Sequence, residues 1–172
     1  KDRSDASILK AIAEEAEKEG ITLLNITSFA SSLLAPEGVI TEKTPAEEEW
    51  KDIAFGWRVA KEIGRLGIGQ TVVVKNQAVM AVEAIEGTDE AIKRGGRLAG
   101  KGAVVVKVSW PNMDMRFEVP VVGLDTLKAM VEVNAKVLAV EANKCILLDR
   151  DKIIEKSKKA SISVVGYSGT GA

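Results

Sequence analysis

The chain has 172 residues, of which 46% are hydrophobic and 28% are charged, and its formal net charge is −1. This composition supports one sizeable hydrophobic core, and the balanced charge gives no sign of a nucleic-acid partner. The sequence contains no histidine, which excludes Ser-His-Asp and Cys-His nucleophilic sites and zinc bound through histidine.

A single cysteine, Cys145, lies in an apolar run and is expected to be a buried core residue. One cysteine allows no internal disulfide, which fits a reducing compartment such as the cytoplasm. No apolar run approaches the length of about 20 residues that a membrane-spanning helix needs. Because the chain begins at Lys1 rather than at Met, we expect a piece of a longer protein.

The first third of the chain predicts a helix, a short strand and a short helix, followed by a linker and a long helix. Residues 4–19 show an apolar stripe at helical spacing, and Gly20 ends that pattern. A strand is expected over 21–26 and a helix over 28–34. Residues 35–44 indicate a linker, and Thr44-Pro45 predicts the start of a helix that reaches about residue 66. We therefore interpret 1–34 as the end of one α/β domain and 35–67 as a linker with its connecting helix.

Residues 68–167 predict a second α/β domain with a mixed sheet, because hairpins occur among the helices. The tail at 168–172 is rich in glycine and is expected to be disordered. The expected strands lie at 72–74 and 78–82 around a turn at 75–77, at 103–108, at 114–120, at 137–140 and 145–148 as a pair, and at 162–165. The expected helices lie at 89–98, 124–132 and 151–159.

A first acidic cluster follows the strand at 78–82. Glu83 stands where the pattern expects an apolar residue, and Glu86 and Asp89 flank Gly87-Thr88, which indicates the start of a helix. Carboxylates beside a phosphate would repel it unless a divalent cation lay between them, so this cluster suggests a metal with a phosphate substrate. The alternative is that Thr88 or Asp89 caps the helix and that Glu86 is solvated. The quartet Ala-Val-Glu-Ala occurs at 81–84 and again at 139–142, which is too short to establish a repeat.

A second cluster places Asp114, Arg116 and Glu118 at a spacing of two, which in a strand puts them on one face. The alternative is a solvent-facing strand edge with a surface ion pair. Lys107 ends an apolar strand, where its amine could neutralise phosphate charge or extend into solvent. From the residues alone, the prediction is acid-rich, Mg²⁺-dependent phosphate chemistry.

Several segments together resemble one family, the metal-dependent UDP-2,3-diacylglucosamine pyrophosphatases of lipid A biosynthesis that are unrelated to calcineurin-like phosphoesterases. The similar segments are Leu-Ala-Pro-Glu-Gly-Val at 34–39, Gly-Gln-Thr-Val-Val-Val at 69–74, 81–89, Val-Lys at 106–107, Asp-Met-Arg-Phe-Glu-Val-Pro at 114–120, 139–142, and Leu-Leu-Asp-Arg at 147–150. The resemblance covers about residues 4 to 167. It departs from the family pattern at Asn76-Gln77, where Asp-Gly is expected, and at Glu118, where Asp is common.

The resemblance implies an N-terminal Rossmann-like domain and a C-terminal α/β domain with substrate between them. The implied reaction is hydrolysis of UDP-2,3-diacylglucosamine to UMP and 2,3-diacylglucosamine 1-phosphate, with Mg²⁺ or Mn²⁺ as cofactor. It also implies a lipid-linked nucleotide-sugar substrate, a homodimer, and a cytoplasmic location with peripheral contact to the inner membrane.

The residues expected to carry this function are Asp114 and Arg116 for catalysis, Thr88, Lys107 and Arg116 for substrate binding, and Glu83, Glu86, Asp89 and Asp114 as metal ligands. Two alternatives stay open: a phosphoesterase for another nucleotide-sugar, and a non-catalytic dimerisation module whose acids are surface groups and caps.

Overall fold

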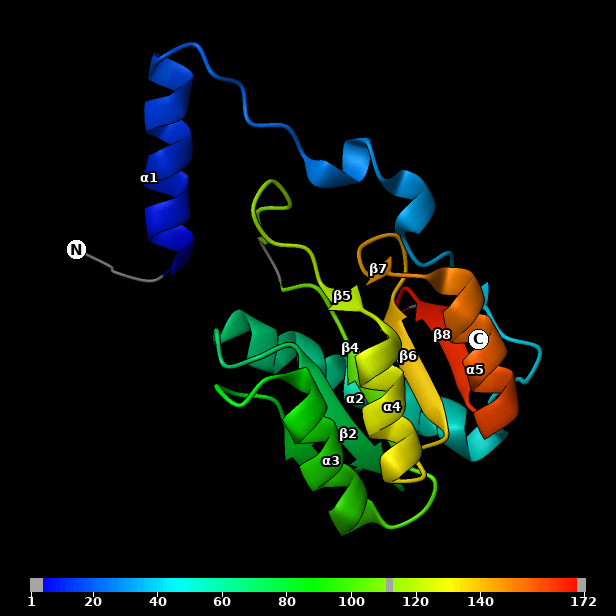
Figure 1. Ribbon diagram of the computed structural model, residues 1–172. Helices are drawn as coiled ribbons and strands as arrows, with labels where there is room; N and C mark the ends of the chain where they lie inside the picture. Colours follow the sequence, from blue (N-terminus) through cyan, green and yellow to red (C-terminus); the bar gives the residue numbers. More distant parts are fainter. Residues whose placement is uncertain (1–4, 111–112, 170–172) are drawn as a thin grey trace.

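The computed structural model of the protein describes residues 5–110 and 113–169 and shows an α/β fold, as the sequence predicts (Figure 1). Six strands form one mixed sheet in the order β1-β8-β6-β4-β2-β3. These strands are β1 (Gly38–Val39), β2 (Thr71–Lys75), β3 (Ala78–Val82), β4 (Val104–Lys107), β6 (Val137–Glu141) and β8 (Ser163–Tyr167). Two short strands, β5 (Val121–Val122) and β7 (Ile146–Leu147), pair separately in parallel.

Strands β4, β6 and β8 are parallel, whereas β1, β2 and β3 each run antiparallel to a neighbour. The parallel strands are joined through α4 (Leu124–Glu132) and α5 (Arg150–Ala160), since a parallel connection needs a crossover. Their carboxyl ends therefore meet at one edge of the sheet. The start of β2 pairs with the end of β4, and the end of β3 pairs with the start of β2. The start of β2 and the end of β3 therefore lie at this edge too. We call this the carboxyl edge.

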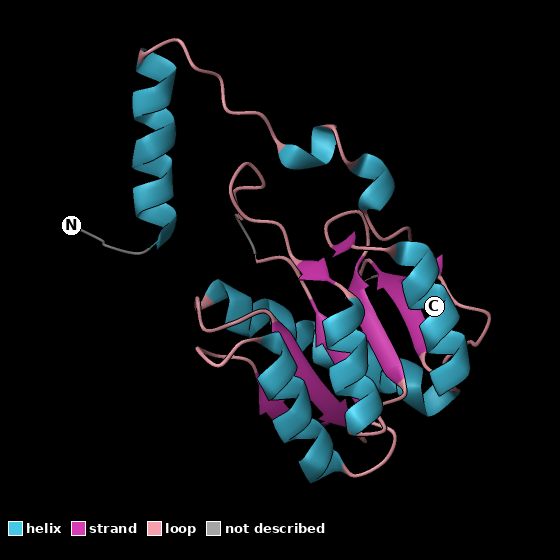
Figure 2. Ribbon diagram, viewed as in Figure 1, coloured by secondary structure: helices cyan, strands magenta, loops and turns pink. Residues whose placement is uncertain are grey.

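Helices lie on both faces of the sheet (Figure 2), and one layer of the core lies on each face. Helices α3 (Thr88–Ala99), α4 and α5 cover one face, where Ile92, Met130 and Ile153 are buried. Helix α2 (Glu47–Arg65) covers the other face through Ile53 and Ala60. Because both faces are covered, the central strands read as continuous apolar runs.

Helix α2 belongs to this packed unit, whereas the sequence suggested a connecting helix outside a domain that begins at residue 68. Residues 35–41 also lie against the sheet, where the sequence predicted a linker. Ala35 is fully buried, β1 pairs with β8, and the Thr41 hydroxyl accepts a hydrogen bond from Val164 N at 2.9 Å. The helix begins at Glu47 instead of Thr44-Pro45, and the Glu49 carboxylate accepts the Ala46 amide at 2.8 Å.

The N-terminal part agrees with the sequence for one helix and corrects the strand that should follow it. Helix α1 (Asp5–Lys18) matches its prediction closely. The strand expected over 21–26 is wrong, because the Asn25 side chain accepts hydrogen bonds from the amide and hydroxyl of Thr27 and forms a turn. Two short 3₁₀ turns, Ile26–Ser28 and Ser31–Leu33, replace the helix expected over 28–34.

In the second half, the hairpin is confirmed, and Asn76 and Gln77 both take positive φ angles, as a two-residue hairpin turn requires. The pairing expected between 137–140 and 145–148 is wrong, since β6 pairs with β4 and β8 while β7 pairs with β5. Among the described helices, none is long and apolar enough to cross a membrane. Of the tail predicted to be disordered, residues 170–172 lie outside the described residues.

Candidate active site

Three charged side chains are buried at the carboxyl edge, each where a strand ends. Lys107 is the last residue of β4, Glu141 is the last residue of β6, and Glu83 follows β3 directly. The exposed fractions of the whole residues are 5%, 4% and 7%. In open α/β sheets, ligands bind outside the carboxyl ends of the parallel strands, so this edge is the candidate site.

Lys107, Thr88 and Glu83 form a continuous hydrogen-bonded chain. Lys107 Nζ donates to Thr88 Oγ1 at 2.7 Å, and Thr88 Oγ1 donates to Glu83 Oε1 at 2.8 Å. The backbone N–H of Gln70 donates to Glu83 Oε2 at 3.3 Å. Thr88 is the first residue of α3, whose N-cap is Gly87 with a φ of 84°. A buried cation beside a helix N-terminus is an arrangement that favours an anionic ligand such as phosphate.

The other two acids of the first cluster point to different partners. Glu86 forms an ion pair with Arg94 and accepts the Ala84 amide at 3.1 Å. The hydrogen bond from Arg94 holds the pKa of Glu86 below its usual range. Asp89 accepts the hydroxyl of Thr126 in α4 at 3.0 Å, which joins the first turns of α3 and α4.

Asp114 and Arg116 lie in a turn, so the strand expected over 114–120 is wrong. The Asp114 carboxylate accepts the Arg116 amide at 3.1 Å, and Arg116 Nη2 donates to Asp114 Oδ2 at 2.7 Å. This short-range pairing competes with strand formation. The guanidinium lowers the pKa of Asp114, and Arg116 Nη1 also contacts Glu17 of α1 at 3.3 Å. Glu118 helps to line a cavity of about 260 Å³ beside Trp110.

The four carboxylates expected as metal ligands do not converge in this structure. Glu83, Glu86, Asp89 and Asp114 each hold a different partner, as described above. Within residues 5–110 and 113–169, no group of three or more His, Cys, Asp or Glu side chains is arranged to hold a metal ion. The chain's own residues therefore do not fit a metal site built from this whole set.

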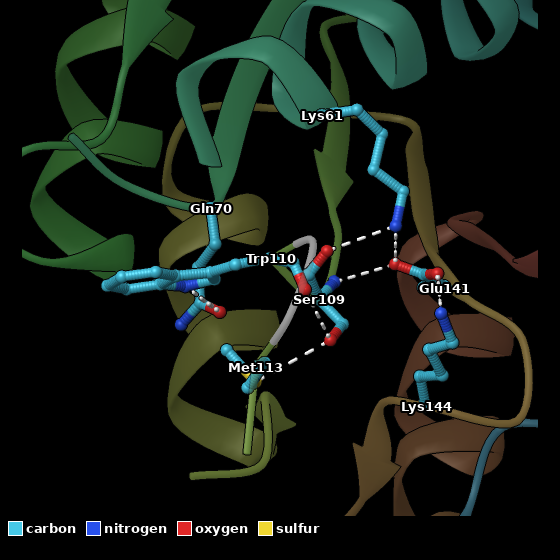
Figure 3. A network of polar contacts seen from close by, with 7 residues as sticks. All are labelled: Lys61, Gln70, Ser109, Trp110, Met113, Glu141 and Lys144. Atoms are coloured by element: carbon cyan, nitrogen blue, oxygen red, sulfur yellow. Dashed lines mark hydrogen bonds and ion pairs between the residues drawn. The ribbon is translucent and has the colours of Figure 1, made fainter. Parts of the chain in front are cut away.

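A second polar network at the same edge was not predicted (Figure 3). Lys61 of α2 forms an ion pair with Glu141 and donates to the Ser109 carbonyl at 3.0 Å. The Ser109 amide donates to Glu141 Oε2 at 2.7 Å, and Lys144 Nζ lies 3.0 Å from Glu141 Oε1. A signal was present in the sequence, since Glu141 is the acid of the second Ala-Val-Glu-Ala quartet, as Glu83 is of the first.

Residues 36–165 match the family model of the LpxI C-terminal domain. The chain is also similar to the "UDP-2,3-diacylglucosamine pyrophosphatase LpxI" of Caulobacter vibrioides, with 30% identity over 172 residues. That alignment covers 95% of this chain and 61% of the relative, so the chain spans about three fifths of the relative's length. The matched region contains both buried networks of the carboxyl edge and the turn that holds Asp114. The similarity confirms the resemblance seen in the sequence, and the chain belongs to the LpxI C-terminal domain family.

Proposed function

We propose that this chain takes part in hydrolysis of the pyrophosphate bond of UDP-2,3-diacylglucosamine, which yields UMP and 2,3-diacylglucosamine 1-phosphate. The observation that carries the proposal is the match along 95% of the chain to a relative that bears this activity in its name. The geometry adds support, because Lys107 lies buried at the N-terminus of α3, where a phosphate would be stabilised.

In the proposed reaction, a water molecule attacks a phosphorus atom, and the P–O bond to the bridging oxygen breaks. Asp114 would orient the water by accepting a hydrogen bond. Its carboxylate is ionised at neutral pH, and the hydrogen bond from Arg116 lowers its pKa further. Arg116 and Lys107 would offset negative charge on the phosphate oxygens, and an Arg guanidinium can do this through two parallel hydrogen bonds.

A requirement for Mg²⁺, or for Mn²⁺, is part of the proposal. Mg²⁺ keeps several waters and usually takes one or two carboxylates together with substrate phosphates. A single carboxylate such as Asp114, which bonds to Arg116 but is 40% exposed, would therefore suffice. The acids at 83–89 bond to other elements of the domain. The check is to remove divalent ions with EDTA and then to titrate Mg²⁺ and Mn²⁺. Full turnover in EDTA would contradict this part.

The activity itself is tested by release of UMP. UDP-2,3-diacylglucosamine and UDP-GlcNAc would be offered separately with Mg²⁺, to the 172-residue chain and to any longer product of the same gene. We expect UMP from the diacylated substrate and at most traces from UDP-GlcNAc. Equal release from both would indicate a general nucleotide-sugar phosphoesterase. No release by either protein would contradict the proposal and favour a non-catalytic module.

We further propose a cytoplasmic protein that contacts the inner membrane peripherally and forms a homodimer. A diacylated substrate resides in membranes, so an enzyme that uses it must reach the bilayer surface. Sedimentation with lipid vesicles would test the membrane contact. Light scattering coupled to size-exclusion chromatography would test the dimer, and a monomer at micromolar concentration would contradict it.

A further inference from the structure

The peptide group of Ser109 is held from both sides at the point where the chain leaves β4. Its amide donates to Glu141 Oε2 at 2.7 Å, and its carbonyl accepts from Lys61 Nζ at 3.0 Å. Lys61 and Glu141 also form an ion pair with each other (Figure 3). The two side chains come from α2 and β6, which lie 48 and 32 residues away from Ser109 in the sequence.

Beyond Ser109, the loop has few other attachments to the domain. For described residues between Val108 and Pro120, the backbone-to-backbone hydrogen bonds stay within the loop, as from Met113 to Trp110 and from Phe117 to Asp114. Val108 itself still bonds to Gln70, and Pro120 to Ile146. Among the described side chains of the loop, two polar contacts reach beyond it: the Trp110 indole donates to Gln70 Oε1 at 3.2 Å, and Arg116 contacts Glu17. The hold on Ser109 therefore fixes the direction in which the loop leaves the sheet.

The carboxylate of Glu141 is fully engaged in this task. Oε2 accepts from Ser109 and pairs with Lys61, while Oε1 pairs with Lys144 at 3.0 Å. The side chain is 6% exposed, and both of its oxygens already bind donors of the chain, so it is not free to bind a substrate. Lys61 also lies over the Trp57 ring at 4.9 Å, which further restricts its amine.

We propose that Glu141 and Lys61 are positioning residues for the loop that carries Asp114 and Arg116. The inference rests on the proposed function for its catalytic consequence. A buried ion pair is an inefficient source of stability, because packed apolar residues of similar volume are often as good or better. Such a pair does, however, orient a peptide group from two directions. A displacement of about 1 Å at a catalytic group can cost roughly 10²-fold in rate, so this orientation has a functional value.

The first test is amide hydrogen exchange in peptides that cover residues 109–118, which requires no activity. The variants are Glu141→Ala, Glu141→Gln and Lys61→Met. Glu62→Gln is the matched control. Glu62 lies next to Lys61 on the same helix, and the substitution breaks only a surface ion pair with Arg65. We expect exchange in the loop to accelerate roughly tenfold or more in Glu141→Ala and Lys61→Met. We expect β6 and α4 to stay protected, and the control to match wild type.

The second test is steady-state kinetics of UMP release by the same variants in the protein that shows activity. We expect kcat to fall roughly 10- to 100-fold with KM changed less than about threefold, and Lys61→Arg to recover part of the loss. If Glu141→Ala fails to fold, the result for Lys61→Met and Glu141→Gln decides the test, since each variant keeps one of the two side chains that bond to the Ser109 peptide group. Unchanged loop exchange in folded Lys61→Met and Glu141→Gln would overturn the inference, as would wild-type kcat. If the wild-type protein releases no UMP, the proposed function fails, and hydrogen exchange still decides whether the pair holds the loop.

Discussion

The buried amine of Lys107 leads to a prediction for both stability and activity. Lys107 is 5% exposed and donates to Thr88, which in turn donates to Glu83. Removing one partner of a buried charge pair costs about 3–5 kcal/mol, because the remaining charge stays buried without compensation. Lys107→Met would leave the Glu83 carboxylate buried without the cation that reaches it through Thr88. We therefore expect the free energy of unfolding to fall by about 3 kcal/mol.

Thr88→Val serves as the comparison, because it removes the hydroxyl that links the two charged groups and keeps both of them. This nearly isosteric change removes the hydroxyl that contacts both the Lys107 amine and the Glu83 carboxylate. Two buried charged groups would each lose a hydrogen bond, which costs about 1–3 kcal/mol per unsatisfied group. We expect a loss of about 2–6 kcal/mol, and Thr88→Ser should restore most of it because the hydroxyl returns.

The measurement is urea unfolding of wild type, Lys107→Met, Thr88→Val and Thr88→Ser, followed by kcat/KM for UMP release. Lys107→Met should lose turnover even under conditions in which the variant is fully folded, because a bound phosphate would lose its counter-charge. Unchanged stability in Lys107→Met would show that the amine does not compensate the buried Glu83 charge. Wild-type turnover in that variant would remove Lys107 from the proposed phosphate site.

Asp114→Ala should lower turnover roughly 10²–10⁴-fold with little change in melting temperature, because Asp114 lies in a partly exposed turn. Arg116→Ala should raise KM as well as lower kcat, and wild-type kinetics in either folded variant would refute these roles. Burial raises the pKa of Cys145 to about 12, so a thiol reagent at pH 8 should modify the protein only as fast as it unfolds. Fast labelling of the folded protein would contradict that burial. Gly95→Ala should destabilise the fold by about 1–3 kcal/mol despite its better helix propensity, as urea unfolding would measure. Its Cβ would lie 2.6 Å from the Cβ of buried Val73, and unchanged stability would show that α3 can shift away.

Elements defined by local patterns were predictable from the sequence. Helix α4 has the predicted bounds, and the hairpin of β2 and β3 follows from two apolar runs around a two-residue turn. Elements that depend on distant partners were not predictable. The segment at 21–26 has strand-like composition, but Ile21 and Leu24 are more than half exposed and the segment forms no strand. The parallel pair of β5 and β7 joins segments about 25 residues apart and leaves no periodic signal.

The candidate site shows the same division. Glu83 and Lys107 could be selected from the sequence, because each is a charged residue where an apolar strand pattern ends. Glu141 carries the same signal and was overlooked. Lys61 could not have been selected, since it is one of several charged residues on the amphipathic helix α2. Its link to Glu141 spans 80 residues and exists only because α2 packs across the sheet.

The two copies of Ala-Val-Glu-Ala distinguish the positioning residues of the proposed site from those that would act on phosphate. Each copy ends a strand at the carboxyl edge, and each glutamate is buried and holds another element. Glu83 holds Thr88 at the start of α3, and Glu141 holds Ser109 at the start of the loop. Acids that are buried and hold another element are poor candidates for metal ligands or proton acceptors. The proposed chemistry therefore falls to Asp114 and Arg116, which bond to each other but are 40% and 29% exposed. The buried acids fix the positions of the groups that would contact phosphate, and the exposed pair would act on it.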